Sequence, residues 1–192
     1  MKSVVLLALC CAASAFASEP EVLAATTWQA TAGAPVYAVQ KLKAGGAVYL
    51  EVADPFGKPV WRSPDLGSED HLLSMRGTPS ALAVEDVTGD GVPELVTAAF
   101  YGPEASGLYV FAGSPQAGFR AVPVLDARTR ARAEHFVSDR PLSEGRDLRC
   151  LPGGRVRVIG RSFSADGTPP QVMAWSYTFR DGAYWLADVD QP

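Results

Sequence analysis

The chain of 192 residues has few residues that cross-link a protein or change charge near neutral pH, with only three cysteines and two histidines. Cys10 and Cys11 lie inside an N-terminal apolar run, so removal of that run would leave Cys150 alone and prevent any intramolecular disulfide. Stability must then come from the core or from a bound metal. We expect Cys150 to be a buried, unreactive thiol; a reactive or intermolecular cysteine is the alternative.

Long hydrophobic runs and an excess of positive charge are also absent. No apolar run reaches the length of about 20 residues that crosses a bilayer, so no transmembrane segment is predicted. Seventeen Lys and Arg against 21 Asp and Glu give a net charge of −4, which disfavours nucleic acid as the main partner.

The N-terminus has the pattern of a cleaved signal peptide. Lys2 precedes the apolar run from Val4 to Ala13, and Ala15-Phe16-Ala17 supplies small residues in an A-x-A arrangement. We predict cleavage after residue 17, export to the periplasm or the outside, and one domain over residues 18–192. Lipidation at Cys10 is the alternative, although the apolar stretch continues past it.

Strand patterns dominate the remaining sequence, so the chain is predicted to be mainly β. One hairpin is expected from Ala47–Ala53 returning through 59–62, and another, with an Asp181-Gly182 turn, from Val172–Phe179 returning through 183–189. Further strands are expected over 95–101, 108–111, 119–125 and 155–159. Helix is expected at most over Ala127–Phe136, which is rich in good helix formers.

One segment carries the pattern of a metal-binding loop. Asp86, Thr88, Asp90 and Glu94 place oxygen-bearing side chains at positions 1, 3, 5 and 9, and Gly91 stands at position 6. The carbonyl of Val92, at position 7, adds a natural backbone ligand. Ca²⁺ prefers six to eight such oxygens, so we predict a structural calcium loop. A metal-free turn, with carboxylates that accept backbone N–H groups, and another cation are the alternatives.

The stretch Ala81–Val96 resembles the FG-GAP or VCBS repeat, the blade unit of integrin-like β-propellers. The downstream stretch Gly107–Phe111 also looks like the family's next strand, so the match covers about 30 residues. The resemblance implies that the acidic loop joins two blade strands and that Asp86, Thr88, Asp90, Val92 and Glu94 bind Ca²⁺. Thr88 replaces the family's usual Asp or Asn, which implies weak affinity.

A second D-G-x-P stretch at Asp166–Val172 follows the first, at Asp90–Val96, by 76 residues, but it keeps only one carboxylate, so we predict no metal there. At about 50 to 60 residues a blade, the exported part would supply about three blades, and closed propellers take at least four. We therefore predict about three small antiparallel sheets in a blade-like arrangement, as a partial or atypical propeller that could close with a second copy.

Arginine is concentrated between residues 120 and 161, where ten Arg and no Lys accompany five acidic residues. Arg155, Arg157 and Arg161 are a candidate patch for an anionic partner, because guanidinium groups bind carboxylate, phosphate or sulfate bidentately. The alternative is a solvated strand face with internal ion pairs.

Catalytic patterns are not found. His71 and His135 fit no nucleophile or zinc motif, and we expect each to be a surface or capping residue. The stripe of Met173, Trp175, Tyr177 and Phe179 is expected to face the core rather than a sugar. The sequence thus predicts an exported, non-enzymatic protein that binds a protein or glycan. An inhibitor or immunity-like protein that blocks an exported enzyme is the second hypothesis, and a hydrolase on a propeller-like scaffold is the third.

Overall fold

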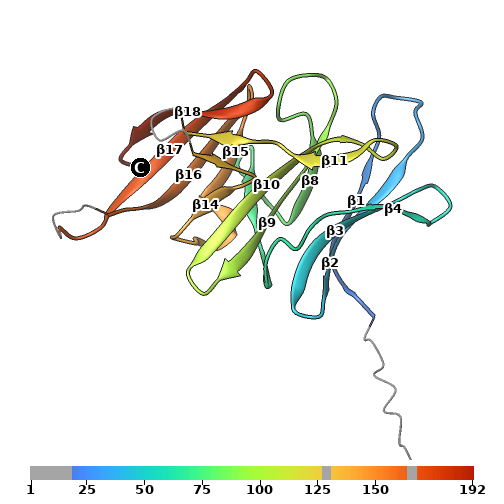
Figure 1. Ribbon diagram of the computed structural model, residues 1–192, viewed down its shortest axis with the longest axis horizontal. Coiled ribbons are helices and arrows are strands. Elements are labelled where there is room, and N and C mark those ends of the chain that lie inside the picture. The colour runs from blue at the N-terminus through green and yellow to red at the C-terminus, as the bar shows by residue number, and fades with distance from the viewer. Residues whose placement is uncertain (1–18, 127–130, 164–167) are drawn as a thin grey trace, which may run out of the picture.

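The computed structural model describes residues 19–126, 131–163 and 168–192. Its strands form three sheets that lie side by side (Figure 1), and none of them closes into a barrel within these ranges. The one helical element described is the 3-10 turn η1 (Ser143–Gly145), and no described helix is long and apolar enough to cross a membrane. The predicted mainly β fold with three sheets and little helix is confirmed. The predicted signal peptide, residues 1–17, lies outside the described residues.

Sheet A is a four-stranded antiparallel meander at one end of the molecule (Figure 1). Its strands are β1 (Glu21–Trp28), β2 (Tyr37–Ala44), β3 (Ala47–Ala53) and β4 (Pro59–Arg62). The hairpin of β3 and β4 has the predicted bounds. Its turn is closed by the Asp54 carboxylate, which accepts the backbone N–H groups of Phe56 and Lys58, both at 2.9 Å.

Sheet B lies in the middle and is built on the long hairpin of β9 and β10. Its strands are β5 (Glu69–His71), β8 (Leu82–Glu85), β9 (Glu94–Gly102), β10 (Ala105–Ser114), β11 (Gly118–Ala121) and β14 (Phe136–Ser138). Strand β9 pairs with β8 over one half and with β5 over the other. Strand β10 pairs in the same way with β11 and β14.

Sheet C has eight strands in the order β13-β12-β18-β17-β16-β15-β6-β7. They are β6 (Leu73–Met75), β7 (Thr78–Ser80), β12 (Val124–Leu125), β13 (Arg132–Ala133), β15 (Leu148–Leu151), β16 (Arg155–Ser162), β17 (Gln171–Arg180) and β18 (Ala183–Asp190). Two pairs, β12 with β18 and β15 with β6, are parallel. The hairpin of β17 and β18 is as predicted, with Asp181 and Gly182 at φ 52° and 75°.

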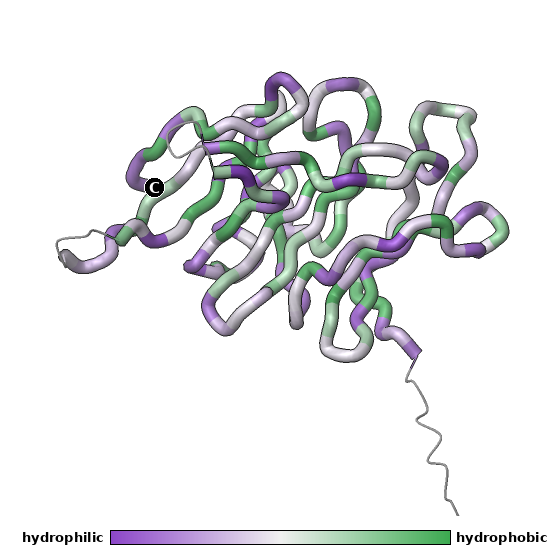
Figure 2. The backbone as a smooth tube through the Cα atoms, viewed as in Figure 1, coloured by the Kyte–Doolittle hydropathy of each residue, from purple (hydrophilic) through white to green (hydrophobic). Residues whose placement is uncertain are grey.

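The core consists of two hydrophobic clusters on opposite faces of sheet B. Leu95, Tyr109 and Phe111 belong to the cluster shared with sheet A, whereas their neighbours Val96 and Val110 belong to the cluster shared with sheet C. Successive side chains of a strand point to opposite faces, so β9 must be apolar on both, which explains its continuous apolar sequence. In Figure 2 the central strands are largely green, and many hydrophilic segments lie at turns.

Lys41 places an ammonium group between sheets A and B. Its side chain has an exposed fraction of 0%, and its Nζ donates to the carbonyl oxygens of His71 (3.3 Å), Ala81 (3.1 Å) and Ala98 (2.5 Å). It also forms an ion pair with Asp70. Burial lowers the pKa of Lys41, and the carboxylate of Asp70 opposes that shift. The charge is thus held by four oxygens in place of water.

Replacing Lys41 with Met keeps the length of the side chain but leaves three carbonyl groups and one carboxylate without their donor. We expect Lys41→Met to lower the free energy of unfolding by about 3 to 5 kcal/mol, measured by urea denaturation. Lys43→Met is the matched control, since Lys43 pairs with Glu69 at the surface, and it should change stability by less than about 1 kcal/mol. Equal effects of the two changes would contradict the role assigned to Lys41.

The prediction of a helix over Ala127–Phe136 is wrong for those residues of the segment that the structure describes. Residues 127–130 lie outside the described ranges, while Arg132 and Ala133 form β13 and Phe136 begins β14. Phe136 is buried against the rings of Tyr177 and Tyr184 at centroid distances of 5.0 and 5.1 Å. Pairing of β13 with β12 and burial of Phe136 outweigh the helix propensity of the segment.

Cys150 is buried in β15 with an exposed fraction of 1%, so its predicted burial is confirmed. Burial raises the pKa of its thiol to about 12, with a smaller contribution from Glu85. The thiol therefore stays protonated in the folded protein at pH values at which the unfolded chain carries a thiolate.

The higher pKa of the Cys150 thiol in the folded protein than in the unfolded chain predicts a loss of stability at alkaline pH. The folded state binds more protons than the unfolded state between pH 9.0, the ordinary pKa of a cysteine thiol, and about pH 12, so stability should fall as pH rises through this window. We expect Cys150→Ala to make the decline shallower by up to about 1.4 kcal/mol per pH unit, in urea denaturation at about pH 8 to 11 with reductant. Parallel curves for both proteins would contradict this.

Candidate functional site

The acidic loop predicted to bind Ca²⁺ connects β8 to β9 at the tip of their hairpin (Figure 1). Gly89 and Gly91 have φ values of 84° and 87°, which only glycine adopts easily. The two oxygens of Asp86 accept the N–H groups of these glycines at 2.6 and 3.0 Å. Asp90 accepts the N–H of Val92 at 2.8 Å. The predicted position of this loop between two strands is confirmed.

Glu94 differs from the other carboxylates of the loop because it is buried, with an exposed fraction of 1%. It accepts the N–H groups of Val87 (2.8 Å) and Thr88 (3.1 Å) and the hydroxyl of Thr88 (3.0 Å). Burial nevertheless raises the pKa of Glu94, since these hydrogen bonds do not fully replace hydration. The folded protein therefore holds a carboxylate whose negative charge is poorly compensated.

The carboxylates of Asp86, Asp90 and Glu94 come together, with one oxygen of each within 4.8 Å of the others. Two ligands of one Ca²⁺, each about 2.3 to 2.6 Å away, can be separated by up to about 5 Å. These three side chains therefore fit a common Ca²⁺. The hydroxyl of Thr88 lies in the same loop and donates to Glu94, and Val92 is 37% exposed beside it.

Both ends of the loop are held by neighbouring sheets. The hydroxyl of Tyr184, in β18, donates to the carbonyl of Val87 at 3.0 Å, and the indole N–H of Trp28, in β1, donates to the carbonyl of Pro93 at 2.7 Å. The loop therefore contacts sheets A and C as well as its own sheet B.

The predicted arginine patch lies on β16, where Val156 and Val158 are buried and the arginines point the other way. Arg157 pairs with Asp190 at 3.0 Å, and Arg161 pairs with Glu104 at 3.0 Å. Arg155 donates to the carbonyl of Pro152 at 3.1 Å. Acceptors within the chain thus already engage all three side chains, and an anionic partner for them stays a prediction.

The expectation that His71 is a surface or capping residue is wrong. Its exposed fraction is 7%, its ring lies 4.4 Å from that of Phe100, and its Nε2 lies 3.2 Å from the Asp147 carboxylate. Asp147 also accepts the hydroxyl of Ser106 and the N–H of Leu142, both at 3.0 Å. Burial alone would raise the pKa of Asp147, but the hydrogen bonds from His71 and Leu142 and the charge of His71 hold it below its usual value.

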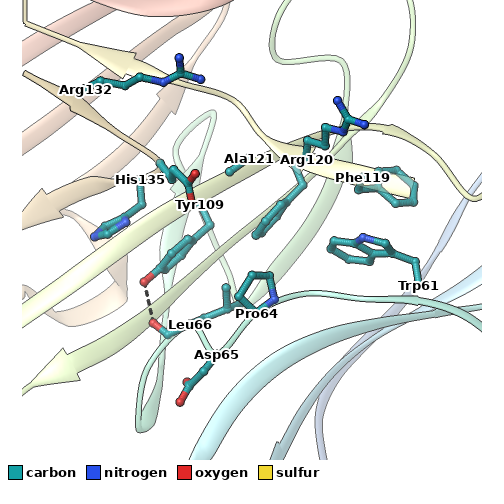
Figure 3. Close-up of a pocket in the computed structure, with 12 residues that line it drawn as sticks. Trp61, Pro64, Asp65, Leu66, Tyr109, Phe119, Arg120, Ala121, Arg132 and His135 are labelled. Carbon is teal, nitrogen blue, oxygen red and sulfur yellow. Dashed lines mark hydrogen bonds between the residues drawn. The ribbon is translucent and has the colours of Figure 1, made fainter. Parts of the chain in front are cut away.

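A cavity of about 530 Å³, here called the aromatic pocket, was not foreseen (Figure 3). Four rings line it, from Trp61, Tyr109, Phe111 and Phe119. Its charged side chains are those of Asp65, Arg120, Arg132 and Glu134. The lining residues come from β4 of sheet A, β10 and β11 of sheet B, β13 of sheet C and the segments beside these strands, so the pocket forms only when all three sheets pack together.

His135 also lines the aromatic pocket, half-buried, with its ring stacked on that of Tyr109 at 4.8 Å. Burial lowers the pKa of His135, and Glu134 opposes the shift. The one local signal for the pocket was the alternation of Tyr109, Phe111 and Phe119 on one face of the β10–β11 hairpin. The aromatic stripe of β17, which was expected to face the core, packs against it through Tyr177 and Phe179.

No protein-family model, curated protein or solved structure matches the chain. The resemblance to the FG-GAP or VCBS repeat therefore depends on the motif residues of this chain alone.

Proposed function

We propose that the chain is an exported, non-enzymatic binding protein, similar to FG-GAP or VCBS blades, whose acidic loop holds one structural Ca²⁺. The observation that carries the metal proposal is the convergence of Asp86, Asp90 and Glu94, with oxygens within 4.8 Å of one another. Asp86, Asp90 and Glu94, with Thr88 and the Val92 carbonyl, would hold the ion. The ion would supply the positive charge that the buried Glu94 lacks.

The position of the loop supports a structural role for the ion. Tyr184 and Trp28 bind the loop at Val87 and Pro93, so a stiffer loop would stabilise the junction of all three sheets. Each carboxylate is also oriented by backbone N–H groups, so little rearrangement would be needed to bind a cation. The same hydrogen bonds would keep a metal-free turn intact, so the experiment must separate the two.

Thermal unfolding in EDTA, in Ca²⁺ and in Mg²⁺ tests this proposal. Ca²⁺ at about 100 times its Kd should add about 2.7 kcal/mol of stability, and Mg²⁺ should add less. Asp90→Asn should abolish the Ca²⁺ response without harming the metal-free fold, because an Asn oxygen can still accept the Val92 N–H.

The matched control is Asp54→Asn, in the β3–β4 turn, where the aspartate also accepts backbone N–H groups but belongs to no cluster of three acidic groups among the described residues. Its Ca²⁺ response should equal that of the wild type. A folded protein whose melting temperature does not respond to Ca²⁺ would establish the loop as a metal-free turn.

One observation favours the second hypothesis, an inhibitor that inserts a loop into an exported enzyme. Phe56, at the tip of the β3–β4 hairpin, is 95% exposed, and Asp54 fixes the turn that presents it. A rigid turn with an exposed aromatic side chain loses little conformational entropy when it enters an apolar pocket.

If this hypothesis holds, Phe56→Ala should weaken binding to the target enzyme by at least about tenfold, a loss of about 1.4 kcal/mol, and should abolish its inhibition. The readout is the activity of an enzyme that co-purifies with the wild-type protein. Phe163→Ala, which removes another exposed ring (68%) directly after β16 of sheet C, is the control and should retain full inhibition. Equal inhibition by both variants would exclude Phe56 as the inserted residue.

A further inference from the structure

We propose that the aromatic pocket is part of a groove that binds a neutral oligosaccharide. The inference extends the proposed binding function by naming a ligand class, and it does not depend on the calcium loop. It rests on the shape of the groove, its fixed rings and its balanced set of unpaired charges.

The groove is longer than the aromatic pocket alone. A second cavity of about 470 Å³, here called the side pocket, is lined by Gly46, Ser68 and Tyr101 and shares Asp65, Tyr109 and His135 with the aromatic pocket. The two cavities are therefore adjacent, and the side chains of Tyr109 and His135 line both. Each volume is within the range of about 300 to 1,000 Å³ that is typical of ligand sites. Two adjacent compartments fit a chain of ring-shaped units better than one compact ligand.

The walls of the groove are fixed before any ligand binds. Tyr109 donates its hydroxyl to the Leu66 carbonyl at 2.6 Å, a hydrogen bond visible in Figure 3. The Trp61 ring is packed edge-on against Phe119 at 5.2 Å and Phe111 at 5.5 Å. Rings held in this way lose little entropy on binding, so their faces are preorganised for a ligand.

Ring surface is available at both ends of the groove. Trp61 is half-buried in the aromatic pocket, and Tyr101 is 42% exposed in the side pocket. The indole N–H of Trp61 has no acceptor among the described residues, so it is free to donate to a ligand. The C–H faces of a sugar pack on aromatic rings, while its hydroxyl groups can both donate and accept hydrogen bonds.

The charges of the groove balance. Arg120 and Arg132 supply two positive charges and Asp65 and Glu134 two negative charges, and within the described residues none of these four side chains forms an ion pair. His135 adds no positive charge at neutral pH, because burial lowers its pKa further below neutrality. Asp65 and Glu134 would oppose an anionic ligand, and the two arginines would oppose a cationic one. Sugar hydroxyls can donate to the carboxylates and accept from the guanidinium groups.

Saturation-transfer NMR and calorimetry with neutral tetrasaccharides of glucose, xylose, mannose and N-acetylglucosamine test the inference. At least one should bind with a Kd of about 1 mM or tighter. Trp61→Ala should weaken that binding at least about tenfold, and Trp185→Ala, which removes a half-buried indole on sheet C, should not change it.

Glu134→Gln and Arg120→Gln keep the test valid if Trp61→Ala does not fold. Both wild-type side chains lie at the surface of the groove and are unpaired within the described residues, so these variants should fold normally and weaken binding about three- to tenfold. If both variants bind the sugar as tightly as the wild type does, the sugar does not bind in the groove and the inference is wrong.

A tetrasaccharide of uronic acid and an aromatic carboxylate, indole-3-acetate, are the comparison ligands. If only these anionic ligands bind, and Arg120→Gln abolishes their binding, the groove binds anions. The proposal of a neutral sugar ligand is then wrong, whereas the proposed binding function is not contradicted. If no ligand binds at about 10 mM, ten times the expected Kd, the inference fails and the calcium response still tests the proposed function separately.

Discussion

Sheet B is covered on both faces, and the rest of the structure depends on this constraint. Its strands β9 and β10 send alternate side chains into two different cores, so both sheets A and C must pack on it. A polar group between these layers has no access to water and needs partners in the protein.

Strand β5 provides hydrogen-bonding partners for the buried polar groups at two adjacent residues, Asp70 and His71. Asp70 and the His71 carbonyl hold the Lys41 ammonium from sheet A, while the His71 ring contacts Asp147, next to β15 of sheet C. One three-residue strand thus connects all three sheets through buried polar contacts.

Patterns in the sequence predicted the elements whose partners are close in the chain. The hairpins β3–β4 and β17–β18 have strong alternation and turn residues that determine their geometry, and both formed as expected. Short strands with distant partners gave no such signal. Strand β6 pairs in parallel with β15, far along the chain. The segment 119–125, expected as one strand, divides into β11 in sheet B and β12, which pairs in parallel with β18 in sheet C. The sequence around Arg132 and Phe136 favours helix locally, and only the partners that fold around it make it extended.

The two candidate sites differ in predictability for the same reason. The acidic loop is a contiguous stretch, so the spacing of its carboxylates and glycines was enough to predict where they meet. The aromatic pocket combines Trp61 of β4, Phe119 of β11 and His135 near β14, and no local spacing links them. His71 shows the same limit, because its ring is buried by Phe100 and by Asp147, 76 residues further along the chain. A histidine in a polar stretch gives no sign of such burial.

A chain with one described cysteine, Cys150, must join its sheets without disulfides, and the positions of its polar contacts show how. Lys41 joins sheet A to sheet B, and Asp147 joins sheet B to sheet C through His71 and Ser106. The acidic loop is the third junction, because Trp28 and Tyr184 reach it from the two outer sheets. Trp28 also packs edge-on against Phe119, a ring of the aromatic pocket, at 5.7 Å. A cation held by the loop would thus stiffen the same Trp28–Phe119 contact that fixes one wall of the proposed groove, so the two proposed sites would be mechanically linked.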